Sequence, residues 1–414
     1  MTDNDILAYL NRTTIKNEEL FDSLYFELTR SLYHYGYNFI NPRESNKKKP
    51  KKLRKFIVEF LVNNFFSKIT IPYILSKFNN KKDLIISNSS FNVNRHLNDL
   101  GFNIAKPLWM GFSWKPKEQI LTDIDLYQQT LKIKSYLTIG NFNDLISNAF
   151  QDYLMLFRDK LTKFYSKFDI KALIVPYDVP FFENLHIKIF RDLDIPSFIF
   201  LHGLPGRYNL LDDNRSDYLI VWGELIKDFY ISYGYKKDKI IVSGHPYYQN
   251  FKKKDLKFNF KKILILSKSI PGAIQRGKKE EYFDRSKSLL YLLKIKYILK
   301  KFNINNVRLR LHPSENPNWY KRYIDNDFFK IDGENLKNSL EKSSLVIGPS
   351  STVLLESIYY GVNYVVFEPT NDNGNSIINE EIVPPFDGSV EGIPVAKNEN
   401  QLENILAKKN KFDI

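Results

Sequence analysis

The stretch from Ser343 to Pro369, SSLVIGPSSTVLLESIYYGVNYVVFEP, constrains the fold more than any other part of the sequence. Leu345 to Ile347 form an apolar run without polar interruption, which is typical of a strand buried on both faces of a parallel sheet. Gly348 and Pro349 end this run, a helix-like pattern follows, and Tyr364 to Phe367 give a second apolar run. The segment therefore predicts a βαβ unit.

Three hydroxyl side chains stand where the helix of this unit would begin, namely Ser350, Ser351 and Thr352. Backbone N–H groups and hydroxyls at the positive end of a helix can bind an anion, most simply a phosphate. Serine is also a common N-cap with no further role. The segment alone leaves both interpretations open.

Apolar runs of the same kind recur along the chain and are separated by helix-like segments. They lie at 83–87, 172–176, 197–201, 218–222 and 239–243, and then, after a lysine-rich stretch, at 262–267, 307–312, 345–348, 364–368 and 392–396. This alternation predicts parallel sheets with helices on both faces. We therefore expect an α/β chain with two Rossmann-like domains, residues 81–255 and 256–414, after a helical N-terminal segment, residues 1–80.

The charge and composition bear on partners and on location. With 61 Lys+Arg against 47 Asp+Glu, the formal net charge is +14, which favours anionic partners. Cysteine is absent, which excludes disulfides and thiolate metal sites. The N-terminus lacks a signal-peptide pattern and no apolar run approaches the ~20 residues that span a bilayer, so we expect a cytoplasmic protein.

A lysine-rich segment, Lys47 to Lys55, precedes the apolar and aromatic sequence FIVEFLVNNFF. A basic cluster beside an amphipathic segment can hold a protein on an anionic membrane. A solvated loop that leads into a core helix is the other interpretation. Peripheral contact with the inner face of the plasma membrane is therefore a hypothesis at this stage.

Ligands of parallel α/β sheets bind at the carboxyl ends of the strands, so the residues that follow each apolar run are candidates for a site. In the first domain these include Asp178, His202, Gly203 and His245, of which we expect His245 to be structural. The His202 imidazole can accept a proton near neutral pH, as activation of an acceptor hydroxyl requires. Asp178 or Glu183 could do the same or orient His202, and Gly203 and Glu183 are expected to contact the acceptor.

The second domain offers anion recognition at its strand ends. The candidates are Ser267, Lys268, His312, Pro313 and the hydroxyls of Ser350, Ser351 and Thr352, with Arg276 as a further cation. Together such groups could stabilise a leaving phosphate. The chain has no complete P-loop, GxGxxG fingerprint or HExxH motif, which argues against a classical nucleoside triphosphatase, dehydrogenase or metalloprotease.

These residues carry a family resemblance. RLHPSEN at 310–316 and GPSST at 348–352 resemble the HP and serine motifs of bacterial sialyltransferases and polysialyltransferases, and more broadly of GT-B transferases of capsule and lipopolysaccharide synthesis. LHGLPGRY at 201–208 resembles the HGxP motif of CDP-glycerol glycerophosphotransferases, and residues 216–251 are similar to the interdomain region of such capsule enzymes. The acidic-acidic-glycine motif of the sialyltransferases is absent, so His202 or Asp178 would be the base.

The resemblance implies a GT-B fold, in which two Rossmann-like domains face a cleft, and a metal-independent glycosyltransferase without a cofactor. The donor would be a CMP-activated sugar, such as sialic acid or Kdo, whose phosphate would contact the motif residues His312, Ser350 and Ser351. The acceptor would be a bacterial surface glycan or glycolipid.

Two alternatives remain open at the sequence level. A UDP-sugar transferase or a non-hydrolysing sugar-nucleotide epimerase would have the same fold. The hypothesis of a basic nucleic-acid-binding protein is supported by the charge alone. No RNA- or DNA-binding module is recognisable, and the lysines are spread along the chain. We therefore expect no nucleic-acid partner.

Overall fold

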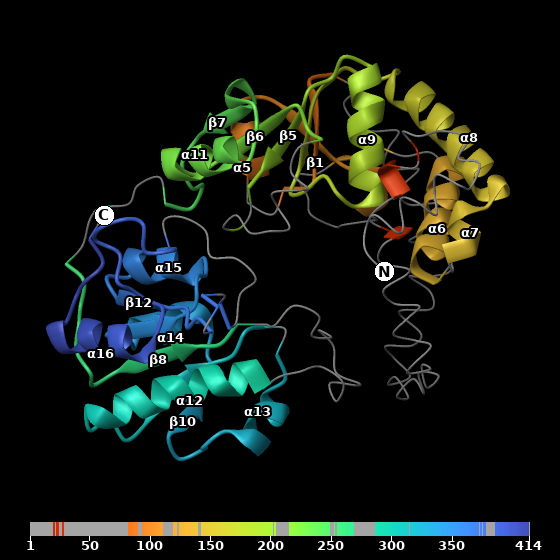
Figure 1. Ribbon diagram of the computed structural model, residues 1–414. Coiled ribbons are helices and arrows are strands. Elements are labelled where there is room, and N and C mark those ends of the chain that lie inside the picture. Colours follow the sequence, from red (N-terminus) through yellow and green to blue (C-terminus); the bar gives the residue numbers. More distant parts are fainter. Residues whose placement is uncertain are drawn as a thin grey trace, which may run out of the picture. The chain divides into compact units, whose positions relative to one another are not determined.

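The computed structural model shows an α/β chain that divides into two compact units, each treated separately below (Figure 1). Unit 1 comprises Met1–His202, Leu211–Trp222 and Tyr235–Pro246, and unit 2 comprises Gly203–Leu210, Gly223–Gly234 and Tyr247–Ile414. The structure describes residues 20, 22–24, 27–28, 82–89, 93–110, 119–121, 124–139, 142–201, 203, 215–248, 252, 255–268, 286–313, 315–371, 373–374, 376–377 and 386–413.

Unit 1 contains a parallel sheet of seven strands in the order β3-β2-β1-β4-β5-β6-β7. The strands are β1 (Leu84–Ser87), β2 (Asn103–Lys106), β3 (Gln119–Ile120), β4 (Ile170–Val175), β5 (Ser197–Phe200), β6 (Tyr218–Val221) and β7 (Ile240–Val242). The chain builds outwards from β1 to β3 and then returns to place β4 beside β1. The central strands β1 and β4 are almost entirely buried, as expected for a parallel sheet covered on both faces.

Helices connect these strands and cover the sheet. They are α5 (Val93–Asp99), the 3₁₀ helices η2 (Leu108–Met110) and η3 (Lys237–Lys239), α6 (Ile124–Ile139), α7 (Phe142–Ile146), α8 (Asn148–Tyr165) and α9 (Phe181–Asp192). α11 (Glu224–Ser232) lies between β6 and β7 in the chain but belongs to unit 2. Nine of the twelve residues of α9 are buried, and Glu183 is one of them. A helix that is buried over most of its surface also takes its charged residues into the interior.

Unit 2 contains a parallel sheet of six strands in the order β10-β9-β8-β11-β12-β13. The strands are β8 (Ile263–Leu266), β9 (Val307–Arg310), β10 (Phe329–Ile331), β11 (Leu345–Gly348), β12 (Asn363–Phe367) and β13 (Val395–Ala396). The helices are α12 (Ser286–Lys301), α13 (Pro317–Tyr323), α14 (Leu336–Glu341), α15 (Val353–Tyr359) and α16 (Glu399–Lys408). The chain again builds outwards on one side, from β8 to β10, before β11 returns to the other side of β8.

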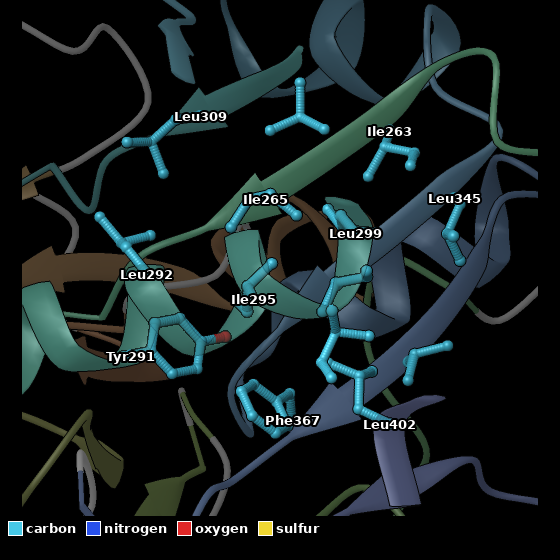
Figure 2. Close-up of a cluster of buried hydrophobic side chains, with 14 of the residues drawn as sticks. Ile263, Ile265, Tyr291, Leu292, Ile295, Leu299, Leu309, Leu345, Phe367 and Leu402 are labelled. Carbon is cyan, nitrogen blue, oxygen red and sulfur yellow. The ribbon is translucent and has the colours of Figure 1, made fainter. Parts of the chain in front are cut away.

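Alternate strand residues of unit 2 face two separate cores. Ile263, Ile265 and Phe367 pack with Tyr291, Ile295 and other residues of α12 and with Leu402 of α16 (Figure 2). The intervening strand residues, among them Leu264, Val346 and Tyr364, pack on the opposite face with side chains of α14 and α15. The period of two along each strand therefore fixes which helices cover which face.

The expected fold class is confirmed, since the chain contains two Rossmann-like units, which is the domain composition of a GT-B protein. Each of the ten apolar runs named above overlaps one of the strands. The runs missed three strands, β2, β3 and β10, which lie at or next to a sheet edge. Edge strands are covered less completely and need no long apolar run, as the half-exposed FKI of β10 illustrates.

The expected N-terminal helical segment falls mostly outside the described residues. Within it, the described parts of 20–28 are helical, and Leu20, Leu24 and Leu28 are buried. The lysine-rich Lys47–Lys55 lies outside the described residues. The domain boundary near residue 255 stays a prediction. Among the described helices, none combines the length and the apolar character needed to cross a membrane.

Gly348 ends β11 where the chain turns towards the hydroxyl cluster, and its neighbours leave no room for a side chain. A Cβ there would clash with the Tyr364 hydroxyl and lie 3.1 Å from the Cβ of Leu266. Tyr364 is fully buried, and its hydroxyl donates to the Pro349 carbonyl over 2.6 Å. This hydrogen bond fixes the turn after β11, and only glycine permits it.

We predict that Gly348→Ala lowers the free energy of unfolding by about 1–3 kcal/mol, as overpacking of a filled core does. The measurement is chemical denaturation of the full chain. Gly333→Ala, at a position where a Cβ meets nothing within 4 Å, is the matched control. In a Tyr364→Phe background the Gly348→Ala change should be less destabilising, because the clashing hydroxyl is gone; equal destabilisation in both backgrounds would contradict this explanation.

Candidate functional site

The topological switch point of the second sheet brings several of the expected donor-binding residues together. β8 and β11 are neighbours, but the chain leaves them towards opposite sides of the sheet. In parallel α/β sheets, ligands bind in the crevice outside the carboxyl ends of such a strand pair. Ser267 and Lys268 follow β8, and Ser350 follows β11. The Lys268 ammonium donates to the Ser350 carbonyl over 3.4 Å.

The next strand, β9, adds His312 to this edge. The His312 N–H donates to the Ser267 hydroxyl over 2.9 Å, and the Ser267 N–H donates to the Arg310 carbonyl over 3.0 Å. His312 is exposed, and the Glu315 N–H closes the turn that contains Pro313 by donating to the His312 carbonyl. Ser267 therefore fixes the backbone that carries the histidine.

Lys268 is the main source of positive charge in this crevice. Burial lowers the pKa of Lys268, and the negative charge of Glu368 opposes that shift. Within the part of the chain that the structure describes, the carbonyl of Ser350 is the one hydrogen-bond acceptor of this ammonium. Partial burial also lowers the pKa of His312, and the Lys268 charge adds to the effect, which favours a neutral imidazole at pH 7.

Glu368 is a residue of this site that the sequence analysis missed. It follows β12 and is fully buried. Its Oε1 accepts from the Ser350 N–H over 2.6 Å, and its Oε2 accepts from the Ser376 hydroxyl over 3.1 Å. The carboxylate thus orders Ser350 and supplies a negative charge near Lys268. The available signal was a carboxylate directly after the apolar run YVVF, which we counted as part of the strand.

The three hydroxyls have different environments. The Ser351 hydroxyl accepts from the Val353 N–H over 3.3 Å, so the local capping interpretation applies to this residue. Thr352 is the N-cap residue of α15 but makes no side-chain cap. Among the described residues, no partner is found for the hydroxyls of Ser350 and Thr352. Because α15 has only seven residues, we assign the anion-binding potential to Lys268 and these hydroxyls rather than to a helix dipole.

Glu356 is a second residue that the sequence analysis did not identify. It lies four residues after Thr352, and residues with this spacing share a face of a helix. Burial raises the pKa of Glu356, and Tyr248 donates a hydrogen bond to the carboxylate, which opposes that shift. Its Oε2 is buried without a hydrogen-bond partner. A ligand hydroxyl could therefore donate to it.

Unit 1 has its own switch point between β1 and β4, and Asp178 lies just beyond β4. Asp178 is fully buried, and its Oδ2 accepts from the N–H groups of Arg215 and Ser216 over 2.6 and 3.1 Å. These hydrogen bonds hold the chain that enters β6. Its role as a base stays a prediction, and the observed bonds already give it a structural role.

Glu183, in the first turn of α9, is the most strongly perturbed carboxyl at this edge. Burial raises its pKa to about 7, against opposing contributions from the Trp109 hydrogen bond and the Lys134 charge. Trp109 Nε1 donates to Glu183 Oε1 over 3.2 Å, and Lys134 donates to the Trp109 carbonyl. The half-exposed Tyr177, at the end of β4, has a raised pKa because of burial and the Glu183 charge. Glu183 can exchange a proton near neutral pH.

Two candidates lie outside the described residues, His202 and Arg276. Their expected roles stay predictions. Gly203 is described, and a Cβ at this position would meet no atom within 4 Å. Its expected contact with an acceptor also stays a prediction. Among the described residues, no group of three or more His, Asp or Glu side chains is arranged to hold a metal ion.

Two histidines of unit 1 have structural surroundings. The His245 ring packs against Trp222 with centroids 4.4 Å apart, and burial lowers the pKa of His245 to about 4. His186 is fully buried, and burial lowers its pKa to about 3. Its Nδ1 lies 2.7 Å from the Phe182 carbonyl, which can only accept, so Nδ1 carries the proton and Nε2 accepts from the Tyr165 hydroxyl over 3.2 Å.

Comparison with known proteins finds similarity only to solved structures. No protein-family model matches the chain, and no curated protein matches it. Among solved structures, the chain is similar to the UDP-GlcNAc 2-epimerase of Methanocaldococcus jannaschii in complex with UDP-GlcNAc and UDP, with 14% identity, coverage of 77% of this chain and 91% of that chain, and a TM-score of 0.41.

Two further solved structures give similar values. Thermobaculum terrenum O-GlcNAc transferase matches with 11% identity, coverage of 93% and 70% and a TM-score of 0.42. Anabaena HepE in complex with UDP and glucose matches with 10% identity, coverage of 80% and 89% and a TM-score of 0.39. Likenesses of this size assign no activity to this chain.

The buried His186 predicts a pH-dependent contribution to stability. Its folded pKa of about 3 lies below the unfolded value of 6.5, so the unfolded state binds a proton that the folded state does not. Stability is therefore lost as the pH falls below 6.5. We predict that His186→Gln lowers the unfolding free energy by about 1–3 kcal/mol at pH 8, because it disrupts the buried hydrogen bonds, and that the gap to the wild type narrows towards pH 5.

Thermal unfolding of both proteins from pH 8 to pH 5 measures this gap. His96→Gln, at an exposed histidine of α5, is the control and should follow the wild type. Other titrating groups, including Glu183, contribute to both proteins and cancel in the difference. A gap that stays constant with pH would show that His186 is not neutral in the folded state at pH 5.

Proposed function

We propose that the chain is a glycosyltransferase that moves a sugar from a nucleotide-activated donor to a glycan acceptor. Unit 2 would bind the nucleotide through the residues at the carboxyl ends of β8, β9 and β11. Unit 1 would supply the group that accepts the proton of the acceptor hydroxyl. The observation that carries the proposal is the desolvated Lys268 ammonium, which lies beside the unpartnered hydroxyls at the switch point of unit 2.

This arrangement supports binding of a phosphate rather than a neutral ligand. A partly buried ammonium with one long hydrogen bond is costly unless an anion completes its coordination. Phosphate oxygens are strong acceptors for Lys268 and for the hydroxyls of Ser350 and Thr352. A neutral His312 could donate one further hydrogen bond. Glu356, with its unpartnered Oε2, supports a ligand that also carries hydroxyl groups, as a nucleotide does.

The proposed transfer is a single displacement at the anomeric carbon. The acceptor O–H bond breaks as its oxygen bonds to that carbon, and the proton goes to a base in unit 1. The bond between the anomeric carbon and the phosphate oxygen breaks, and the nucleotide leaves with the electron pair. Lys268 and the hydroxyls would stabilise the charge that develops on the leaving phosphate.

Glu183 is the described residue best suited to be the base. A carboxyl with a pKa of about 7 is divided between its two protonation states at neutral pH, which suits general base catalysis. Asp178 already accepts backbone hydrogen bonds from Arg215 and Ser216, which give it a structural role. His202 remains the other candidate proposed from the sequence.

The finer identity of donor and acceptor rests on the motifs RLHPSEN and GPSST. Their resemblance to bacterial sialyltransferase motifs supports CMP as the nucleotide and an acidic sugar as the transferred group. It also supports a capsule or lipopolysaccharide glycan as acceptor, with the protein on the cytoplasmic side of the membrane and without a metal. A UDP-sugar transferase is the neighbouring possibility within the same proposal.

A sugar-nucleotide epimerase is the second candidate, and the perturbed carboxyl Glu183 at the switch point of unit 1 favours it too. Epimerisation at a ring carbon requires loss and return of a carbon-bound proton. Incubation of a UDP-sugar in deuterated water separates the two candidates. Deuterium in recovered UDP-sugar without an acceptor would indicate the epimerase, whereas acceptor-dependent release of free nucleotide would indicate the transferase.

We predict that Lys268→Met weakens CMP binding at least about tenfold, because a hydrogen bond from a charged donor contributes roughly 1.5–3 kcal/mol. Thermal shift and calorimetric titration measure it, since a ligand that binds only the folded state raises its stability. The thermal stability without ligand should not fall, because methionine relieves the desolvation of the ammonium.

Lys262→Met is the matched control for this variant. Lys262 is exposed and precedes β8, at the opposite end of the same strand from Lys268. The Lys262→Met variant should bind CMP as the wild type does. Unchanged CMP affinity in Lys268→Met would reject the phosphate site. Stabilisation of the wild type by UDP rather than CMP would indicate a UDP-sugar as the donor.

We predict that Glu183→Gln lowers kcat about 10²-fold or more, as loss of a general base does. In the wild type the rate should rise with pH through about 7, because only the deprotonated carboxyl can accept the proton. Trp109→Phe removes the hydrogen-bond donor that stabilises the charged form of Glu183. The acidic limb of the pH–rate profile of this variant should therefore move to higher pH. An unshifted profile in Trp109→Phe, or a Glu183→Gln enzyme with normal kcat, would exclude Glu183 as the base.

A further inference from the structure

Helix α12 has an exposed apolar stripe on the side that faces away from the sheet. Leu290, Leu293 and Tyr297 are 43%, 58% and 61% exposed. Their spacing of three and four residues places them on one face of the helix. The opposite face, with Tyr291, Leu292, Ile295 and Leu299 among its residues, packs into the core of unit 2 (Figure 2).

Lysines flank this stripe on both sides. At about 3.6 residues per turn, Lys296 and Lys300 fall on one side, and Lys287, Lys294 and Lys301 fall on the other. The helix sequence SKSLLYLLKIKYILKK contains no acidic residue. The Lys301 ammonium lies 4.9 Å from the centre of the Tyr297 ring, which brings charge and apolar surface together.

Carboxylates of neighbouring elements pair with only some of these lysines. Lys294 pairs with Glu399, Lys301 pairs with Glu403 over 2.6 Å, and Lys296 pairs with Asp325 over 2.7 Å. Among the residues that the structure describes, Lys287 and Lys300 have no carboxylate partner. The face therefore keeps a positive charge, and exposed ion pairs of this kind are weak enough to exchange for other anions.

We propose that α12 docks unit 2 on an anionic lipid bilayer. Leu290, Leu293 and Tyr297 would enter the boundary between headgroups and acyl chains, while the flanking lysines would contact lipid phosphates. At 16 residues, or roughly 24 Å, the helix would lie in the plane of the membrane. A soluble polyanion would use the lysines but offers no apolar environment for the exposed leucines, so charge together with apolar surface favours the bilayer.

The docking surface is separate from the proposed donor site. The stripe faces away from the sheet, whereas Lys268 lies at the carboxyl end of β8. The inference does not depend on the transfer chemistry and can be tested without a substrate.

The absence of cysteine allows a direct test, because a single introduced cysteine can be labelled selectively. The probe is an environment-sensitive fluorophore on Leu293→Cys, mixed with vesicles of phosphatidylcholine alone or of phosphatidylcholine with phosphatidylglycerol. We expect a blue shift with the anionic vesicles only. The matched control is Leu156→Cys on α8, where Leu156 is 61% exposed but has Asp152 and Asp159 at the neighbouring helical positions.

A second test measures vesicle sedimentation. Leu290→Glu with Leu293→Glu should raise the lipid concentration for half-maximal binding at least about tenfold, whereas Leu156→Glu should leave it unchanged. All these positions are exposed, and circular dichroism verifies that the variants fold. Replacing both Lys287 and Lys300 with Gln should also raise the lipid concentration for half-maximal binding, by about fivefold for each lysine near an anionic surface.

Three outcomes would overturn the proposal. The wild type does not bind anionic vesicles; the probe at position 293 does not respond on vesicles that bind the protein; or the double glutamate variant binds as tightly as the wild type. If the binding of that variant also does not depend on Lys287 and Lys300, membrane contact belongs to another segment, such as Lys47–Lys55. If its binding still requires these two lysines, the surface binds a soluble polyanion instead.

Discussion

The order of the strands in the two parallel sheets is the constraint on which the candidate sites depend. In each sheet the chain first builds outwards on one side and then returns to the other side of its starting strand, β1 or β8. The chain therefore leaves the two central strands in opposite directions, and the carboxyl ends of such a pair are where ligands of parallel α/β sheets bind. Polar side chains can stand there at the border of a core that is otherwise apolar. Lys268, Ser350 and Glu183 are functional candidates because of this position.

Much of this arrangement could be predicted from the sequence, because central strands of a parallel sheet must be apolar on both faces. The runs around Leu345 and Ile263 therefore identified both the strands and the residues at their ends. Residues whose partners are distant in sequence could not be found in this way. Glu368 bonds to Ser350, eighteen residues away, and Trp109 bonds to Glu183, 74 residues away. Only the fold brings such pairs together, and it also decides which carboxyl is desolvated.

Glu368 shows how a buried charge can be useful in such a crevice. A fully buried carboxylate is costly unless hydrogen bonds satisfy it, and here two donors do so, Ser350 N–H and the Ser376 hydroxyl. Its negative charge helps Lys268 to keep its proton despite desolvation. The ammonium makes one hydrogen bond within the described residues and therefore still has donors to spare. The pair thus prepares a cation for an anionic ligand before that ligand arrives, which lowers the reorganisation that binding requires.

The two units share one topology and differ in the charge at their switch points. Unit 2 presents the Lys268 ammonium and a histidine that burial and this ammonium keep neutral, whereas unit 1 presents Glu183 and Asp178. A common scaffold therefore carries a group that could attract phosphate in one unit and a group that could accept a proton in the other, as the proposed function requires. Transfer from a phosphate-linked donor to a hydroxyl requires both kinds of group. The desolvation that weakens the acidity of Glu183 is the same physical effect that strengthens the interaction of Lys268 with an anion, because both act where water is excluded.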